Sequence, residues 1–217
     1  MLIYAGLHNP REVFRLKVTD NIDLIDGTMA NCYSVKSDSG EILIDAGTKG
    51  SAKKIISYYE GKGVKPVAVL ITHYHPDHVG GLKEVSDAFH PEIYVPDAEI
   101  EVISGKEKMT PAPSMLSKLV AGIMKSSPVN GLKKASEMSI NGVAVVETPG
   151  HTPGSTSYYF ERDSALFVGD AVVIKNGQTG LNKAFTLDMA RARESKKKIE
   201  SHPASLVLSG HGQPLKK

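Results

Sequence analysis

The chain has 217 residues, of which 41% are hydrophobic, so it is long and apolar enough for one α/β domain with a buried core. That composition argues against extended disorder, and a formal net charge of only +2 argues against strong attraction to nucleic acid or to an anionic membrane. The chain has no run of the roughly 18 apolar residues that a membrane-spanning helix needs, and residues 1–6 lack the features of a signal peptide. We therefore expect a cytoplasmic protein that acts on a small molecule, with no nucleic-acid or membrane partner.

The first half of the sequence predicts short strands that lead into helices. Runs rich in β-branched residues, separated by Asp, Asn, Gly and Ser, predict strands at 13–18, 29–36, 41–45, 67–71 and 92–96. Apolar residues at helical spacing predict helices at 51–61 and 77–89. The single cysteine, Cys32, lies in one of the apolar strand-like runs, so we interpret it as a core residue.

The second half repeats this alternation. It predicts strands at 142–147, 155–161, 165–168 and 206–208 and a helix at 187–201. Strands followed by helices in both halves favour an α/β sandwich of sheets with helices outside. Between residues 99 and 137 the chain is loop-like apart from a predicted amphipathic helix at 114–125, whose start and end suit Pro113 and Pro128.

Three histidines fall within six residues in His73-Tyr-His75-Pro-Asp77-His78. The cluster follows the predicted strand 67–71 and precedes a helix, and such loops gather at the carboxyl edge of a sheet, where ligands bind. His73 and His75 point the same way in extended backbone, whereas Asp77 and His78 lie where the chain has turned. One hexapeptide can therefore present two pairs of ligands, which suits two adjacent metal ions.

Further candidate ligands occur at other strand ends. His151 lies in a rigid Pro/Gly loop, Asp170 ends a strand, and His211 lies between two glycines that permit close approach of the backbone. The remaining histidines, His8, His90 and His202, have no such setting and are interpreted as ordinary residues. Imidazole and carboxylate ligands favour Zn²⁺, and iron and manganese suit the same set.

The motif and its spacing resemble the metallo-β-lactamase superfamily, and most closely its glyoxalase II-like (hydroxyacylglutathione hydrolase-related) branch. The resemblance implies a four-layer αβ/βα sandwich, with residues 1–217 forming one domain that has a helical insertion at about 99–137. It implies two divalent metal ions: one bound by His73, His75 and His151, the other by Asp77, His78 and His211, with Asp170 bridging both. Asp45 would support this ligand loop.

This resemblance also implies a hydrolase that uses a metal-bridging hydroxide to cleave a small ester, thioester or lactone, with Asp77 as a catalytic residue that orients the hydroxide or passes on a proton. Phosphodiester or nucleic-acid hydrolysis and an iron-dependent persulfide dioxygenase are the alternatives. Only six residues follow His211 in the sequence, so we expect the protein to lack the C-terminal helical region of full-length glyoxalase II. Val173 replaces the tyrosine of acyl-homoserine lactonases, and Val168 replaces the arginine of persulfide dioxygenases.

The predicted helix 114–125 has three interpretations: core packing, a wall above the active site, or a subunit interface that would make a homodimer. Its large apolar residues are Met115, Leu116, Leu119, Val120, Ile123 and Met124. The connection that contains it leads to the strand before His151, so it can cross the metal groove. We hypothesise that Leu119, Val120 and Ile123 wall a substrate pocket that favours an apolar acyl group.

Overall fold

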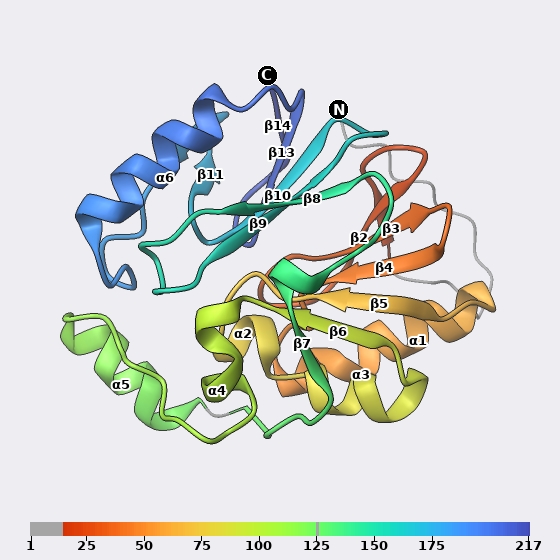
Figure 1. The fold of residues 1–217 in the computed structure, drawn as a ribbon, viewed down its shortest axis with the longest axis horizontal. Coiled ribbons are helices and arrows are strands. Elements are labelled where there is room, and N and C mark those ends of the chain that lie inside the picture. The colour runs from red at the N-terminus through yellow and green to blue at the C-terminus, as the bar shows by residue number, and fades with distance from the viewer. Residues whose placement is uncertain (1–14, 125) are drawn as a thin grey trace.

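The computed structural model describes residues 15–124 and 126–217, which form two stacked β-sheets with helices on their outer faces (Figure 1). The seven-stranded sheet has the order β1 (Arg15–Lys17), β2 (Ile22–Ile25), β3 (Cys32–Ser37), β4 (Gly40–Ile44), β5 (Pro66–Leu70), β6 (Glu92–Val95) and β7 (Leu132–Lys134). The five-stranded sheet has the order β14 (Leu215–Lys216), β13 (Leu206–Ser209), β10 (Ala165–Gly169), β9 (Thr156–Phe160) and β8 (Val143–Glu147). A separate hairpin pairs β11 (Val173–Lys175) with β12 (Gln178–Gly180).

The helices are α1 (Ala52–Lys62), α2 (Pro76–Val79), α3 (Leu82–Phe89), α4 (Ile100–Ile103), α5 (Met115–Ile123) and α6 (Met189–Ser201), and the short 3₁₀ segments are η1 (Lys49–Ser51), η2 (Asp97–Glu99) and η3 (Ala135–Glu137). Helices α1, α3 and α6 cover the outer faces of the two sheets, whereas α5 lies to one side of them (Figure 1). In Figure 1, α6 lies above the five-stranded sheet, and α1 and α3 lie below the seven-stranded one. The predicted αβ/βα sandwich is therefore confirmed.

The alternation of apolar side chains along each strand builds the layers. In β4, Ile42 and Ile44 join the core between the sheets, whereas Leu43 joins the core beneath α1 and α3. In β10, Phe167 faces the other sheet, and Leu166 belongs to the core that includes Ile199 of α6. Each such buried side chain contributes roughly 1.5–3 kcal/mol. Three cores thus hold the four layers together.

Parallel pairing brings the candidate ligands to one place. Strands β4 and β5 run parallel, so Asp45 and the loop that starts at Thr72 leave the first sheet at the same edge. Strands β10 and β13 also run parallel, so Asp170 and His211 leave the second sheet together. The site consequently lies where the carboxyl ends of both sheets meet.

The structure corrects the expectation of one continuous helix at 77–89. The helix is divided into α2 and α3 at Gly80 and Gly81, because the chain passes very close to other backbone there. A Cβ at Gly80 would lie 2.9 Å from the backbone nitrogen of Lys49, and one at Gly81 would lie 2.4 Å from the carbonyl oxygen of Ala46. The N–H of Gly81 donates to the carbonyl of Gly47.

Other elements agree with the expectations within a few residues, and several short ones were not predicted. The unpredicted elements are β2, α4, β7, β11, β12 and β14. The stretch at about 99–137 contains α4 and α5, and also β7, which pairs with β6. Cys32 is fully buried, as predicted for a core residue. The start of the predicted strand 13–18, residues 1–6 and His8 lie outside the described residues. Within the ranges that the structure describes, no helix is both long and apolar enough to cross a membrane.

Candidate metal centre

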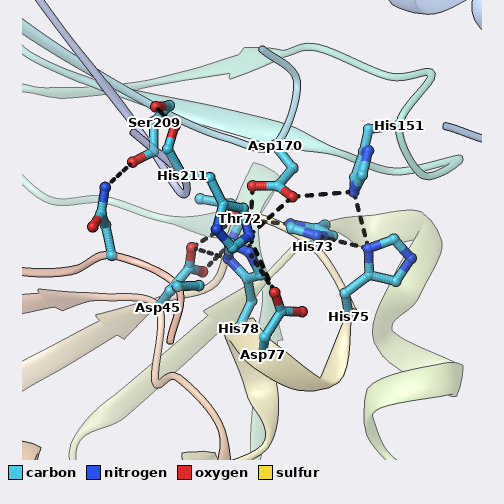
Figure 2. A network of polar contacts seen from close by, with 12 residues as sticks. Asp45, Thr72, His73, His75, Asp77, His78, His151, Asp170, Ser209 and His211 are labelled. Carbon is cyan, nitrogen blue, oxygen red and sulfur yellow. Dashed lines mark hydrogen bonds and ion pairs between the residues drawn. The ribbon is translucent and has the colours of Figure 1, made fainter. Parts of the chain in front are cut away.

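Three imidazoles converge at the first of two ligand groups (Figure 2). Nδ1 of His75 lies 3.0 Å from Nε2 of His73 and 2.9 Å from Nε2 of His151, and all three side chains are buried. His73 and His75 come from the loop after β5, and His151 comes from the loop between β8 and β9. Three ring nitrogens that face one point can share a single metal ion, and their ligand atoms lie within 4.8 Å of one another.

The second group consists of Asp77, His78 and His211. Nε2 of His211 lies 3.2 Å from Oδ2 of Asp77, and Nε2 of His78 lies 3.9 Å from the same oxygen. Asp77 and His78 are in α2, which begins at Pro76, while His211 follows β13. The Asp77 and His211 side chains are partly exposed, at 22% and 36%. This group therefore opens toward solvent, unlike the first.

Asp170 lies between the two groups. Its Oδ2 is 3.6 Å from Nε2 of His151 and 3.5 Å from Nε2 of His211, and its Oδ1 is 3.4 Å from Nε2 of His78. Gly210 permits this close packing, because a Cβ there would lie 2.5 Å from Oδ1 of Asp170. One carboxylate thus faces ligands of both groups.

Asp45 and Thr72 fix the orientation of two histidines. Oδ2 of Asp45 accepts hydrogen bonds from Nδ1 of His78 at 2.7 Å and from the hydroxyl of Thr72 at 2.8 Å. The Thr72 hydroxyl gives its only hydrogen to Asp45, so its oxygen must accept from Nδ1 of His73, 3.1 Å away. Both histidines therefore direct Nε2 toward the centre of the site, and Asp45 lies where the sequence predicted a supporting residue.

The first group is electrostatically suited to stay neutral. Burial, with the neighbouring imidazoles, holds the pKa of His73 well below its ordinary value. Burial also lowers the pKa of His75 to about 3 and that of His151 to about 4. Neutral imidazoles have the lone pairs that metal coordination requires.

The second group is strongly electronegative. Burial disfavours charge on His78, but the surrounding carboxylates outweigh it and raise its pKa well above the ordinary value. The hydrogen bond to Asp77 raises the pKa of His211. Burial opposes ionisation of Asp77, yet His78 and His211 hold the pKa of that carboxyl at about 2. Such a group attracts a cation.

A metal pair fits these residues on structural grounds. Among the described residues, four buried side-chain atoms have no hydrogen-bond partner: Nε2 of His78, Oδ1 of Asp170, Nδ1 of His151 and Oε2 of Glu84. The first two lie 3.4 Å apart and face each other within the site, whereas His151 directs its other ring nitrogen, Nε2, toward His75 and Asp170. Buried polar atoms are ordinarily paired, so unpaired atoms that face a common centre indicate an ion. Two of these atoms, on His78 and Asp170, belong to a third potential ligand set that also includes His73 and connects the two groups.

An apolar cavity of about 330 Å³ adjoins the site. Ligands from both groups line it: His75, Asp77, Asp170 and His211. Its remaining wall is mainly apolar and includes Met29, Met109, Val120, Met124, Val173 and Phe185. No lysine or arginine of residues 15–124 and 126–217 is part of this lining.

Helix α5 contributes one face to the cavity. Val120, Ala121 and Met124 line it, and Ser117 is buried there. Leu119 and Ile123, which we expected in the same wall, are instead on the opposite face of the helix and are 61% and 71% exposed. Met115 and Leu116 share that outer face. The helix is therefore apolar on both sides, and periodicity alone did not show which side faces the site.

Several residues near the site were missed in the sequence. Thr72 gave no signal beyond its position beside His73, and Asn182 and Phe185 of the cavity lie in a segment without a recognisable motif. Two of the three histidines interpreted as ordinary residues lie outside the site: His90 is exposed at the end of α3, and the ring of His202 packs edge-to-face against Tyr159.

Comparison with known proteins identifies the family. The sequence profile described as the metallo-beta-lactamase superfamily matches residues 25–211. The probable metallo-hydrolase YqgX of Bacillus subtilis (strain 168) is 33% identical over 191 residues, covering 84% of this chain and 85% of that protein. A hydroxyacylglutathione hydrolase of Nitrosomonas eutropha is 28% identical over 184 residues, which cover 84% of this chain but 61% of the longer relative.

Solved structures of similar fold lead to the same family. TTHA1623 in a di-iron-bound form has a TM-score of 0.71 at 26% identity, with 89% of this chain and 92% of that chain covered. The BLEG-1 B3 metallo-beta-lactamase has a TM-score of 0.70 at 27% identity, with 88% and 90% covered. The profile match includes Asp45 and all seven candidate ligands, from His73 to His211. The chain belongs to the metallo-β-lactamase superfamily.

Proposed function

We propose that the protein is a binuclear metallohydrolase that cleaves a small ester, thioester or lactone with an uncharged, apolar acyl group. The observation that carries this proposal is the cavity of about 330 Å³, whose apolar wall adjoins ligands of both groups. A substrate that fills it with an acyl chain would have its carbonyl beside those ligands. Apolar pockets with a few convergent polar groups are typical of small-molecule sites.

The residues of the first and second groups would hold one divalent metal each, with Asp170 between them, and Zn²⁺ is the metal that we propose. A relative in a di-iron-bound form makes iron the alternative to test. When bound, such a pair lowers the pKa of water and polarises a carbonyl group.

The protein's own residues orient the reactants. Asp77 lines the cavity, and its low pKa keeps it ionised, so it can accept a hydrogen bond from water and point that water toward the substrate. Asp45 and Thr72 hold His78 and His73 in the required tautomers. Met29, Met109 and Met124 provide an adaptable apolar wall that excludes bulk water from the acyl group.

The lining also bears on which thioester is cleaved. Glutathione has two carboxylates, and the described cavity lining offers no basic side chain for them. We therefore propose a neutral thioester or ester over a glutathione conjugate, although relatives include hydroxyacylglutathione hydrolases.

An assay panel on metal-loaded protein tests the proposal. It comprises acyl p-nitrophenyl esters, N-acetylcysteamine thioesters, S-lactoylglutathione, acyl-homoserine lactones and bis-p-nitrophenyl phosphate. We expect turnover of the neutral acyl substrates above that of S-lactoylglutathione, and loss of turnover with a chelator. Exclusive turnover of the phosphodiester, or turnover that a chelator leaves intact, would contradict the proposal.

A further inference from the structure

Glu99 is a fully buried carboxylate that belongs to neither ligand group. It is the last residue of η2, directly before α4. Burial raises its pKa to about 7, because the charged form is poorly solvated there. A buried acid of this kind is unfavourable for folding unless its oxygens have specific partners.

Those partners belong to the two loops that carry the first ligand group. Oε2 accepts a hydrogen bond from the backbone N–H of Tyr74 at 2.6 Å, and Tyr74 lies between His73 and His75. Oε1 accepts from the N–H of Gly154 at 2.9 Å and from the hydroxyl of Thr152, the residue after His151.

The contact between Glu99 and the second of these loops is also tight. A Cβ at Gly154 would lie 2.7 Å from Cγ of Glu99, so glycine is required for the loop to approach the acid. Thr152 is further held by Ser155, whose Oγ accepts from the N–H of Thr152 at 2.9 Å. The carboxylate thus connects two loops that come from different sheets.

We propose that Glu99 is a positioning residue that sets the spacing of His73 and His75 relative to His151, and thereby the metal affinity of the first ligand group alone. The second group has a separate support, because Asp45 binds His78 directly. The proposal concerns the metal centre and not the substrate, so it holds or fails independently of the acyl-substrate proposal.

Glutamine cannot replace this acid without loss, although it has the same shape. Its one oxygen can serve Gly154 and Thr152, and its NH₂ group then faces the N–H of Tyr74, donor against donor. Glu99→Gln therefore breaks the connection on the side of His73 and His75 while it preserves the volume of the side chain.

The test is the zinc affinity of each group, measured by competition with a chromophoric chelator. Glu99→Gln is placed in two backgrounds, His211→Ala, which impairs the second group, and His151→Ala, which impairs the first. We expect the tighter zinc affinity to fall about 10- to 100-fold in the His211→Ala background and to stay unchanged in the His151→Ala background.

Two control variants distinguish the positioning role of Glu99 from a general effect of losing a negative charge and from a general loss of stability. Asp97→Asn removes a carboxylate from the same 3₁₀ segment, where it accepts hydrogen bonds from the backbone and hydroxyl of Ser136, and should leave both affinities unchanged. Tyr58→Phe removes a hydroxyl that donates to Asp23 at 2.6 Å in a network without metal ligands. It should lower the free energy of unfolding and leave zinc binding intact.

An equal loss of zinc affinity in both backgrounds, or no loss of zinc affinity in either, would overturn the proposal. If Glu99→Gln does not fold, Thr152→Val supplies the same comparison, because it keeps the acid and removes one donor. A loss confined to the His211→Ala background supports the role of Glu99, and an equal or absent loss refutes it.

Discussion

His78 donates its Nδ1 hydrogen to Oδ2 of Asp45 at 2.7 Å, and the opposite ring nitrogen, Nε2, lies 3.4 Å from Oδ1 of Asp170. Asp45 achieves this with a left-handed backbone, at φ 58°, a conformation that few residues other than Gly, Asn and Asp adopt readily. The same carboxylate also accepts from the backbone and hydroxyl of Thr72. Asp45, directly after β4, therefore fixes the ring orientation of His78 and the start of the segment that contains four of the candidate metal ligands.

Asp45→Asn should weaken metal binding without unfolding the protein. Asparagine tolerates the left-handed backbone, but its amide nitrogen cannot accept the hydrogen of His78. We expect an affinity loss of about 10- to 100-fold at the second group, measured by competitive zinc titration. Asp38→Asn, at an exposed carboxylate paired with Arg162, is the control and should bind zinc normally. Wild-type affinity in Asp45→Asn would contradict the role given to the Asp45–His78 bond.

Asp170→Ala should weaken both metal sites together, because this carboxylate faces ligands of both groups. We expect the metal content to fall and turnover to drop by orders of magnitude. Elemental analysis measures the metal content, and an assay with an acyl ester measures turnover. His90→Ala, at an exposed position, should change neither. Metal content and turnover like those of the wild type in Asp170→Ala would show that the carboxylate does not connect the sites.

Helix α5 offers a matched pair of positions on opposite faces. Val120→Phe fills part of the cavity, so kcat/KM for a long acyl ester should fall roughly 10-fold relative to that for a short one. This loss corresponds to about two buried methylene groups of the substrate, at about 0.8 kcal/mol each. Leu119 is 61% exposed on the opposite face, so Leu119→Phe should leave the preference for acyl chain length unchanged. If both variants have the same dependence of kcat/KM on acyl chain length, α5 does not form part of the substrate pocket. A change in molecular mass for Leu119→Ser would instead show that the outer face joins two copies.

Acidification should remove the two metals in order. The pKa values of His75 and His151 are lowered to about 3 and about 4, so these imidazoles stay neutral at pH 5 and keep their ligand lone pairs. The pKa values of His78 and His211 are raised, so protons compete for them at higher pH, and affinity there falls as the pH drops through those values. As the pH falls, we expect the equivalent at the second group to leave first and the equivalent at the first group to leave only near pH 4. Dialysis at graded pH with elemental analysis measures this, and loss of both equivalents at one midpoint would contradict the assignment.

The sequence predicted the parts of the site that depend on local spacing. His73, His75, Asp77 and His78 are close in the chain, and the strand before them and the helix after them determine where they point. Glu99 could not be predicted in the same way, since its partners Tyr74 and Thr152 lie 25 and 53 residues away. Its burial depends on how the loops of two sheets meet.

The same limit explains the errors in the fold. The break between α2 and α3 arises from backbone packing of Gly80 and Gly81 against distant segments, which helical periodicity does not record. In α5 the apolar residues were identified, but they divide between two faces, and only the tertiary arrangement shows that Val120 faces the cavity while Leu119 does not. Short strands such as β7 form because β6 offers a free edge, not because of their own sequence.

The two ligand groups form a centre for two metal ions, and the number of zinc equivalents that the metal-free protein binds tests this assignment. Metal-free protein is titrated with Zn²⁺ against a chromophoric chelator, and bound metal is counted by elemental analysis after desalting. The arrangement of two ligand groups around Asp170 predicts saturation at two equivalents per chain. Saturation at one equivalent, with zinc, manganese or iron alike, would contradict it.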